Sequence, residues 1–218
     1  MAIAFVQDEV GLNTDGATLA FGVTVTAGSL LVACIRLEVA SHTVVGITDT
    51  LGNSWTQVKR QASADEAAEL WRAASPSGGA NTCTFDWSAT GTAQVTIAEF
   101  SGFSAGVTAG PSNGANDTTS PQTCGEITTT VNDSLLVAML AIDTLFTVSS
   151  RLTGWVGLTS GGNKQDCQYK ITTTTETTDG AVTMAANEST AGAIGAFSET
   201  AAAAGAVRVR RHMLVGVG

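Results

Sequence analysis

A short apolar pattern occurs twice in this chain, at residues 26–33 (Thr-Ala-Gly-Ser-Leu-Leu-Val-Ala) and again at residues 130–138 (Thr-Val-Asn-Asp-Ser-Leu-Leu-Val-Ala). Three further landmarks follow each copy in the same order: a Trp after a Gly-rich turn, an aromatic strand and a Phe-Ser pair. The matched aromatic residues are Trp55 and Trp155, Trp71 and Tyr169, and Phe100 and Phe197. Units of about 100 residues are too long for a solenoid repeat. This repeated pattern therefore predicts two related half-sandwiches, residues 1–103 and 122–200, which we expect to share one domain.

Alternation of apolar and polar residues dominates the chain and is typical of half-buried β-strands. It is found at residues 18–25, where Leu19, Phe21, Val23 and Val25 are expected to share a face, and at residues 82–87 and 167–172. Residues 30–37 and 135–142 are apolar on both faces, as in a central strand. About a dozen such segments at the spacing of a sandwich predict an all-β, jelly-roll-like antiparallel β-sandwich with an internal pseudo-duplication.

Three segments interrupt the strand pattern. Residues 63–70 are the one helix candidate, because Ser63 and Glu66 have capping-box spacing there, and we expect at most a turn or two of helix before a strand begins at Leu70 and Trp71. Residues 104–121 are rich in Gly, Ser, Asn and Pro and are expected to connect the two halves. Residues 201–218 are expected to form an extended C-terminal arm.

Composition and charge exclude several classes of function. The chain has 218 residues, 13% of them charged, and a net charge of −9, which argues against nucleic-acid binding because phosphate contact needs a basic face. No apolar run reaches the roughly 18 residues of a membrane span. The first residues show no signal-peptide pattern. We therefore expect a protein that is made in the cytoplasm and does not associate with a membrane.

The four cysteines, Cys34, Cys83, Cys124 and Cys167, lie far apart, and the chain holds two His. A zinc site needs clustered Cys and His ligands. Small buried hydrophobic side chains are the preferred interpretation of these cysteines, and disulfides are the alternative. No cofactor is expected.

Residues that could carry catalysis or bind a metal are few. His42 lies in a loop and His212 in the arm, and neither has a nucleophile motif beside it. Candidate carboxylates for glycoside hydrolysis are Asp86, Glu99, Asp143 and Glu176, of which Glu99 interrupts an apolar strand. Candidate calcium ligands are Asp8, Glu9 and Asp15, or Asp65, Glu66 and Glu69, in neither case at EF-hand spacing. We expect structural or solvated carboxylates and no enzyme.

Three sequons begin at Asn116, Asn132 and Asn187, and without a secretion signal we interpret these as turn residues.

The arm concentrates three Arg and one His and then ends in an apolar run. Such a tail would be sticky in water, so we expect it to dock by strand addition, either to a neighbouring chain or to its own sheet. The residues expected to bind a partner are Val207, Arg208, Val209, Arg210, Arg211, His212, Met213, Leu214 and Val215.

Two motifs and the tail carry a resemblance. Residues 49–55 (Asp-Thr-Leu-Gly-Asn-Ser-Trp) form a Gly-Asn turn followed by a Trp that opens the next strand and packs inward. With residues 97–102 (Ile-Ala-Glu-Phe-Ser-Gly), they resemble a pattern of bacterial and phage β-sandwich proteins. Residues 210–218 resemble the basic, then Gly/Val-rich tails of tailed-phage structural proteins. The second half departs from the pattern, because residues 154–157 lack the Asp and Asn of the first copy.

The resemblance implies a jelly-roll-like sandwich carried on a virion, as a capsid cement (decoration) protein or a tail accessory, with no catalytic residues. Its partner would be the major capsid protein or another virion protein, and we expect a homo-oligomer, with a trimer as one form. The alternative is a tail-associated carbohydrate-binding or host-adhesion module. Because the four Trp are expected to point inward, the sequence disfavours the stacking platform that such a module uses.

Overall fold

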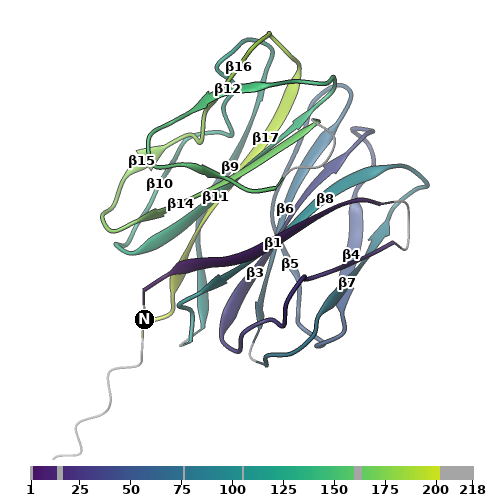
Figure 1. Cartoon of the computed structure of the whole chain (residues 1–218). Helices are drawn as coiled ribbons and strands as arrows, with labels where there is room; N and C mark the ends of the chain where they lie inside the picture. Colours follow the sequence, from purple (N-terminus) through teal and green to yellow (C-terminus); the bar gives the residue numbers. More distant parts are fainter. Residues whose placement is uncertain (1, 14–16, 76, 105, 160–163, 202–218) are drawn as a thin grey trace, which may run out of the picture.

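The computed structural model describes residues 2–13, 17–75, 77–104, 106–159 and 164–201, and these residues form strands and turns with no α-helix among them (Figure 1). The first half contains β1 (Ala4–Asn13), β2 (Thr18–Ala20), β3 (Ser29–Leu37), β4 (Val44–Asp49), β5 (Thr56–Ala62), β6 (Ala67–Ser75), β7 (Thr82–Trp87) and β8 (Ala93–Ser101). The second half contains β9 (Val107–Asp117), β10 (Ile127–Thr128), β11 (Ser134–Ile142), β12 (Val148–Arg151), β13 (Val156–Gly157), β14 (Gln165–Thr172), β15 (Thr177–Thr178), β16 (Val182–Met184) and β17 (Thr190–Glu199). The predicted all-β, antiparallel class is confirmed.

Two five-stranded antiparallel sheets form the centre of the molecule, with the orders β1-β8-β3-β6-β5 and β9-β17-β11-β14-β13. A three-stranded sheet, β2-β7-β4, packs on the first large sheet. The pairs β12-β16 and β10-β15 pack on the second. The two halves are seen in Figure 1 as a purple-to-blue body and a green-to-yellow body.

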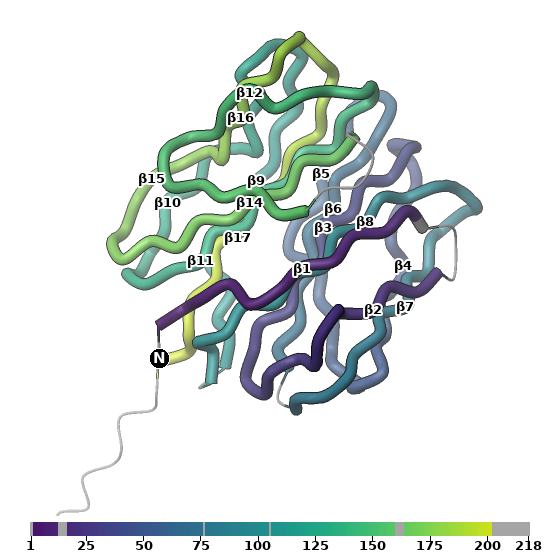
Figure 2. Tube along the Cα trace, viewed as in Figure 1, coloured from purple at the N-terminus to yellow at the C-terminus, as the bar shows by residue number. Residues whose placement is uncertain are grey.

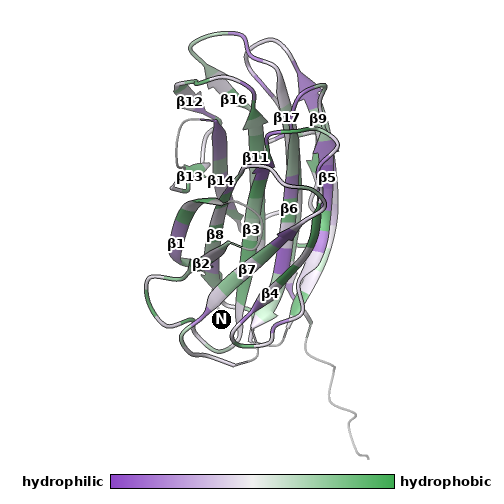
Figure 3. Cartoon of the chain, turned by 90° about the vertical axis from the view of Figure 1, so that its right-hand side faces the viewer, coloured by the Kyte–Doolittle hydropathy of each residue, from purple (hydrophilic) through white to green (hydrophobic). Residues whose placement is uncertain are grey.

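Three apolar clusters lie between these layers. Leu31 of β3 shares the first cluster with Phe85 of β7. Leu30 precedes Leu31 and points to the opposite face of β3. It shares the second cluster with Leu135 of β11, so this cluster joins the two large sheets. The third cluster lies on the far face of β11. Every residue of β3 and β11 is therefore buried, which confirms the prediction of two central strands, and the apolar colour follows these strands in Figure 3.

The pairing registers of the two large sheets correspond strand by strand. Leu30 pairs with Phe100 of β8, and Leu135 pairs with Phe197 of β17. Bulges interrupt the outer pairs β1-β8 and β9-β17 at Phe100 and Phe197. Trp55 and Trp155 directly precede β5 and β13, which pair with β6 and β14 in related registers.

The match of Trp71 with Tyr169 is wrong by one residue. Trp71 pairs with Ala33, and the equivalent partner of Ala138 is Gln168. Because side chains alternate along a strand, Trp71 packs in the first cluster, whereas Tyr169 packs against the cluster between the large sheets.

The predicted helix at residues 63–70 is wrong. Ser63 and Glu66 close a hairpin loop between β5 and β6, in which the Ser63 amide donates to the Glu66 carbonyl (2.9 Å) and the Ser63 hydroxyl donates to the Glu66 carboxylate (2.8 Å). The capping-box spacing thus serves a turn. The residues after it pair with β3, and this long-range pairing overrides the local helix signal.

The predicted connector at residues 104–121 is also wrong for most of its length, because it contains β9, an edge strand that pairs with β17. Predicted alternation at residues 18–25 fails at Val23, which is 61% exposed. The interpretation of the four cysteines as buried side chains is confirmed, since each is free and at most 1% exposed.

Candidate functional site

A cavity of about 780 Å³ lies where the two ends of the described chain meet. The N-terminal strand and the end of β17 lie side by side there (Figure 2). The lining residues come from the N-terminal segment, the start of β9, the turn before β11, and the ends of β14 and β17. They are Ala2, Ile3, Thr108, Val131, Asn132, Asp133, Ile171, Thr173, Ser198, Glu199 and Ala201. We call this cavity the terminal groove.

The terminal groove combines apolar side chains with carboxylates. Val131 and Ile171 line it and are 46% and 37% exposed, although both are large and apolar. Asp133 and Glu199 add two acidic groups to the lining. An exposed apolar surface with polar groups at its margin is typical of a binding site rather than of a solvated end of a sandwich.

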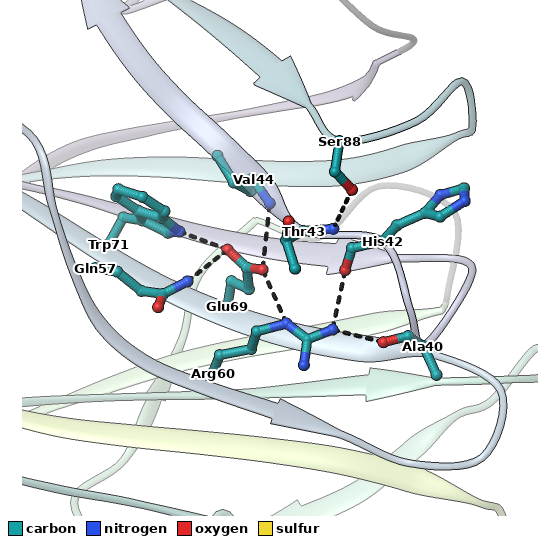
Figure 4. A network of polar contacts seen from close by, with 9 residues as sticks. All are labelled: Ala40, His42, Thr43, Val44, Gln57, Arg60, Glu69, Trp71 and Ser88. Atoms are coloured by element: carbon teal, nitrogen blue, oxygen red, sulfur yellow. Dashed lines mark hydrogen bonds and ion pairs between the residues drawn. The ribbon is translucent and has the colours of Figure 1, made fainter.

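Glu69, a residue of β6, is the centre of a buried polar network (Figure 4). One carboxylate oxygen accepts hydrogen bonds from the Val44 amide and from Nε of Arg60, each at 3.2 Å. The other accepts from Gln57 (2.9 Å) and from the indole N–H of Trp71 (2.8 Å). Four donors occupy the carboxylate, so its geometry is that of a structural acceptor and ion-pair partner.

Arg60 links this network to the loop before β4. Its guanidinium donates to the main-chain carbonyls of Ala40 and His42. The imidazole of His42 points away from Glu69 (Figure 4), so the two side chains do not form an acid–base pair.

Glu99, the carboxylate that interrupts an apolar strand, is fully buried on β8. It accepts hydrogen bonds from Gln7 (2.6 Å), from the Thr26 amide (2.7 Å) and from the Ser29 hydroxyl (2.7 Å). These neutral donors come from β1, from the turn before β3 and from the first residue of β3, so Glu99 ties all three to β8. The interpretation of Glu99 as a structural residue is therefore supported by its contacts.

Asp166 of β14 is 2% exposed and forms an ion pair with Arg151 of β12. Burial raises the pKa of this carboxyl to about 6, and the neighbouring guanidinium opposes the rise. The second carboxylate oxygen is buried without a hydrogen-bond donor in the described structure. Among the described residues, its hydrogen-bond and ion-pair partner is Arg151 and not another carboxyl group.

The other acidic candidates do not converge on one place. Asp8 accepts from the Thr159 amide, whereas Glu9, its neighbour on β1, points to the opposite face. Glu176 forms an ion pair with Lys170 at 2.9 Å. Within the described ranges, no group of three or more His, Cys, Asp and Glu side chains could hold a metal ion. Asp86 and Asp65 are exposed, Asp143 follows β11, and Asp15 and His212 lie outside the described residues.

The motif at residues 49–55 builds a turn between β4 and β5. Partial burial opposes ionisation of Asp49, but hydrogen bonds from Asn53, Trp55 and Asn81 together hold the pKa of its carboxyl below the ordinary value. The indole N–H of Trp55 donates to this carboxylate at 3.0 Å. Gly52 supplies the left-handed φ of +71° that the turn requires. These contacts account for the motif as a structural turn.

The Trp side chains lie wholly or partly inside the sandwich, and the three sequons lie in different environments. Trp71, Trp87 and Trp155 are buried, and Trp55 is partly buried against the first cluster. The interpretation of the sequons as turns is wrong for Asn116, which lies in β9 and donates to the Ala62 carbonyl (2.7 Å). Asn132 and Asn187 lie outside strands and accept hydrogen bonds from the Thr175 and Ser120 amides.

The residues predicted to bind a partner, 207–215, lie outside the described residues. Sequence reasoning missed the terminal groove, since its residues come from five separate segments. One signal was present: Val131 is an apolar residue within the turn that precedes a central strand.

No family model, no curated protein and no solved structure matches this chain. In the described part of the chain, no helix has the length and apolarity that crossing a membrane requires.

Proposed function

We propose that this chain is a non-enzymatic structural protein that joins a larger particle through the segment at residues 207–215. Following the sequence resemblance, the particle would be a phage virion and the chain a capsid cement or decoration protein. The observation that carries this proposal is the terminal groove, which brings exposed apolar side chains, two carboxylates and both ends of the described chain to one end of the molecule.

The body of the molecule fits an architectural role. Two large sheets and three apolar clusters make a thick, layered sandwich. Glu69 and Glu99 are saturated with donors from their own chain, so they brace strands instead of facing a substrate. The strand orders β1-β8-β3-β6 and β2-β7-β4 support the jelly-roll expectation, and the related registers of the two large sheets support the pseudo-duplication. Jelly rolls are common in viral capsids and in lectins, but a fold alone does not assign a function.

The C-terminal segment supplies the chemistry for joining a neighbour. Arg208, Arg210 and Arg211 can pair with carboxylates in bidentate geometry, and the apolar residues beside them can anchor the segment. Many copies on a symmetric particle would sum modest contacts by avidity.

Deletion of residues 202–218 tests this proposal on virions of the phage that carries the gene. We expect the truncated chain to fold, with an unchanged circular dichroism spectrum, and to be lost from purified virions at least tenfold. A matched control keeps the segment but replaces exposed Leu145 by Ser. Incorporation of the truncated chain at the level of the control would refute the assembly role.

The alternative, a tail-associated carbohydrate-binding module, has one favourable observation. Phe5 is 37% exposed and stacks on Tyr169 with a ring-centroid distance of 5.3 Å. A glycan array with the wild type and Phe5→Ala would test it. Binding that Phe5→Ala abolishes would favour the module over the cement protein.

A further inference from the structure

The terminal groove matches the segment at residues 207–215 in both polarity and charge. Its apolar part is formed by Ile3, Val131 and Ile171, and its acidic part by Asp133 and Glu199. The segment has the complementary order, with three Arg and then Met213-Leu214-Val215. A volume of about 780 Å³ is in the range that holds a drug-sized ligand. It therefore suits a few anchoring side chains rather than a whole strand.

Charge and apolar surface together favour this match. The whole chain has 10 Lys and Arg against 19 Asp and Glu, and three of the cations lie in the segment. The rest of the chain is therefore more acidic than the net charge of −9 indicates. A basic segment is attracted to such a body, and the two carboxylates of the groove stand beside its apolar surface, where the Arg and Met-Leu-Val groups can bind together.

We propose that the terminal groove of one copy binds residues 207–215 of a second copy of this chain. This inference rests on the proposed function, because it names the first partner of the same segment. Met213 and Leu214 enter between Val131 and Ile171, and the arginines pair with the exposed Asp133.

The described chain ends at the groove, because Ala201 itself is one of the lining residues. Binding between copies uses the groove and the segment of each copy, and it agrees with the homo-oligomer expected from the sequence resemblance. Binding within one chain would leave a monomer, and the experiment below distinguishes the two arrangements.

A segment-to-groove contact is heterologous, because different surfaces of the two copies meet. Such contacts close into a ring where the rotation allows, or continue as an open chain. The inference therefore links the groove to the expected homo-oligomer and makes the trimer one of its closed forms.

A complementation experiment tests the inference. One variant lacks residues 207–218 and keeps the groove. The other carries Ile171→Glu and Glu199→Lys and keeps the segment. Ile171 and Glu199 are not fully buried, so the second variant should fold, which circular dichroism and thermal unfolding check. The control is Leu145→Glu, at a residue that is 70% exposed and lies outside the groove. Molar mass is measured by light scattering after size exclusion at 50 mM and 500 mM NaCl.

We expect the wild type and the Leu145→Glu control to be oligomeric and each of the two variants to be monomeric. A mixture of the two variants should form a one-to-one dimer, because one supplies the groove and the other the segment. The dimer should weaken by about tenfold at the higher salt, since screening reduces the ion pairs.

A mixture that stays monomeric, or a wild type that is itself monomeric, would overturn the inference, as would variants that remain oligomeric alone. The proposed function fails on a different measurement, namely virion incorporation of the chain without residues 202–218. If the mixed dimer forms while that incorporation is unimpaired, the inference stands and the virion role falls.

Discussion

The two large sheets share their strand order and pairing registers, but their buried polar groups differ in how many hydrogen-bond donors they have. Glu69 of β6 and Asp166 of β14 occupy equivalent positions, opposite Ile35 and Leu140, and each pairs with an Arg. Glu69 has four donors, whereas one oxygen of Asp166 has none. Apolar residues therefore fix the register in both halves, and the polar networks are adapted to each half separately.

The two halves also differ in one residue of β8 and β17 that pairs with the central strand, which is charged in one half and apolar in the other. Glu99 is paired with Leu31, and the equivalent partner of Leu136 is Ala196. The first half thus braces its edge strand with a buried carboxylate, and the second half has an apolar residue at the same place.

The largest expected loss of stability tests the apolar core that the two halves share. Phe100 and Phe197 hold equivalent positions in the cluster between the large sheets, and both are at most 1% exposed. Phe100→Ala and Phe197→Ala should each lower the free energy of unfolding by about 4 kcal/mol, because each leaves a cavity in the same cluster. Urea denaturation measures this loss. A cost under about 1 kcal/mol for one variant would show that the two positions are not equivalent.

The next largest effect is the pH dependence of the stability that Asp166 contributes. Its pKa of about 6 in the folded protein lies above the ordinary value of 3.8, so the folded state holds a proton that the unfolded state releases. This contribution to stability is full below about pH 4 and is lost as the pH rises to about 6, by up to about 3 kcal/mol. The stability of the wild type relative to Asp166→Asn should fall accordingly between pH 4 and pH 7. A constant difference across this range would contradict the assignment.

Glu99→Ala should cost about 2 kcal/mol, because it leaves the Thr26 amide and the Ser29 hydroxyl without their acceptor. Glu99→Gln keeps an acceptor of similar shape and should cost less. Chemical denaturation of both variants gives the order. If Glu99→Ala were neutral, the first half would not depend on the network that the second half lacks.

The smallest effect concerns the turns before β3 and β11. Gly28 has φ of +79°, and a Cβ there would lie 3.2 Å from Cα of Ser104, so Gly28→Ala should cost about 1 kcal/mol. Asp133 is the equivalent residue and adopts φ of +53°. Asp133→Gly should change stability by less than about 0.5 kcal/mol, since relief of the left-handed strain is offset by a more flexible unfolded chain. Thermal unfolding compares the two, and a reversed order would break the correspondence of the turns.

Sequence alone predicted the parts of the fold that depend on apolar pattern. The two central strands were evident because residues 30–37 and 135–142 are apolar on both faces. Edge strand β9 was missed because Gly, Pro, Ser and Asn weaken its pattern, and its place is set by pairing with β17. The helix at residues 63–70 was wrong since local spacing cannot reveal a long-range partner.

The candidate site was less predictable than the fold. The contact of Glu69 with Arg60 follows from the β5-β6 register, and the terminal groove depends on how separate segments end at one place. Neither is encoded in a contiguous motif.

Residues 2 and 201 line the same cavity, and this has a consequence for the connectivity of the chain. A short peptide joining them would close the backbone into a circle, and new ends could then be opened between Phe103 and Val107, where one half passes to the other. In such a circular permutant the strands β9 to β17 would leave the ribosome before β1 to β8, yet every strand pair of the sandwich could still form. We therefore expect the architecture to form whichever half is synthesised first.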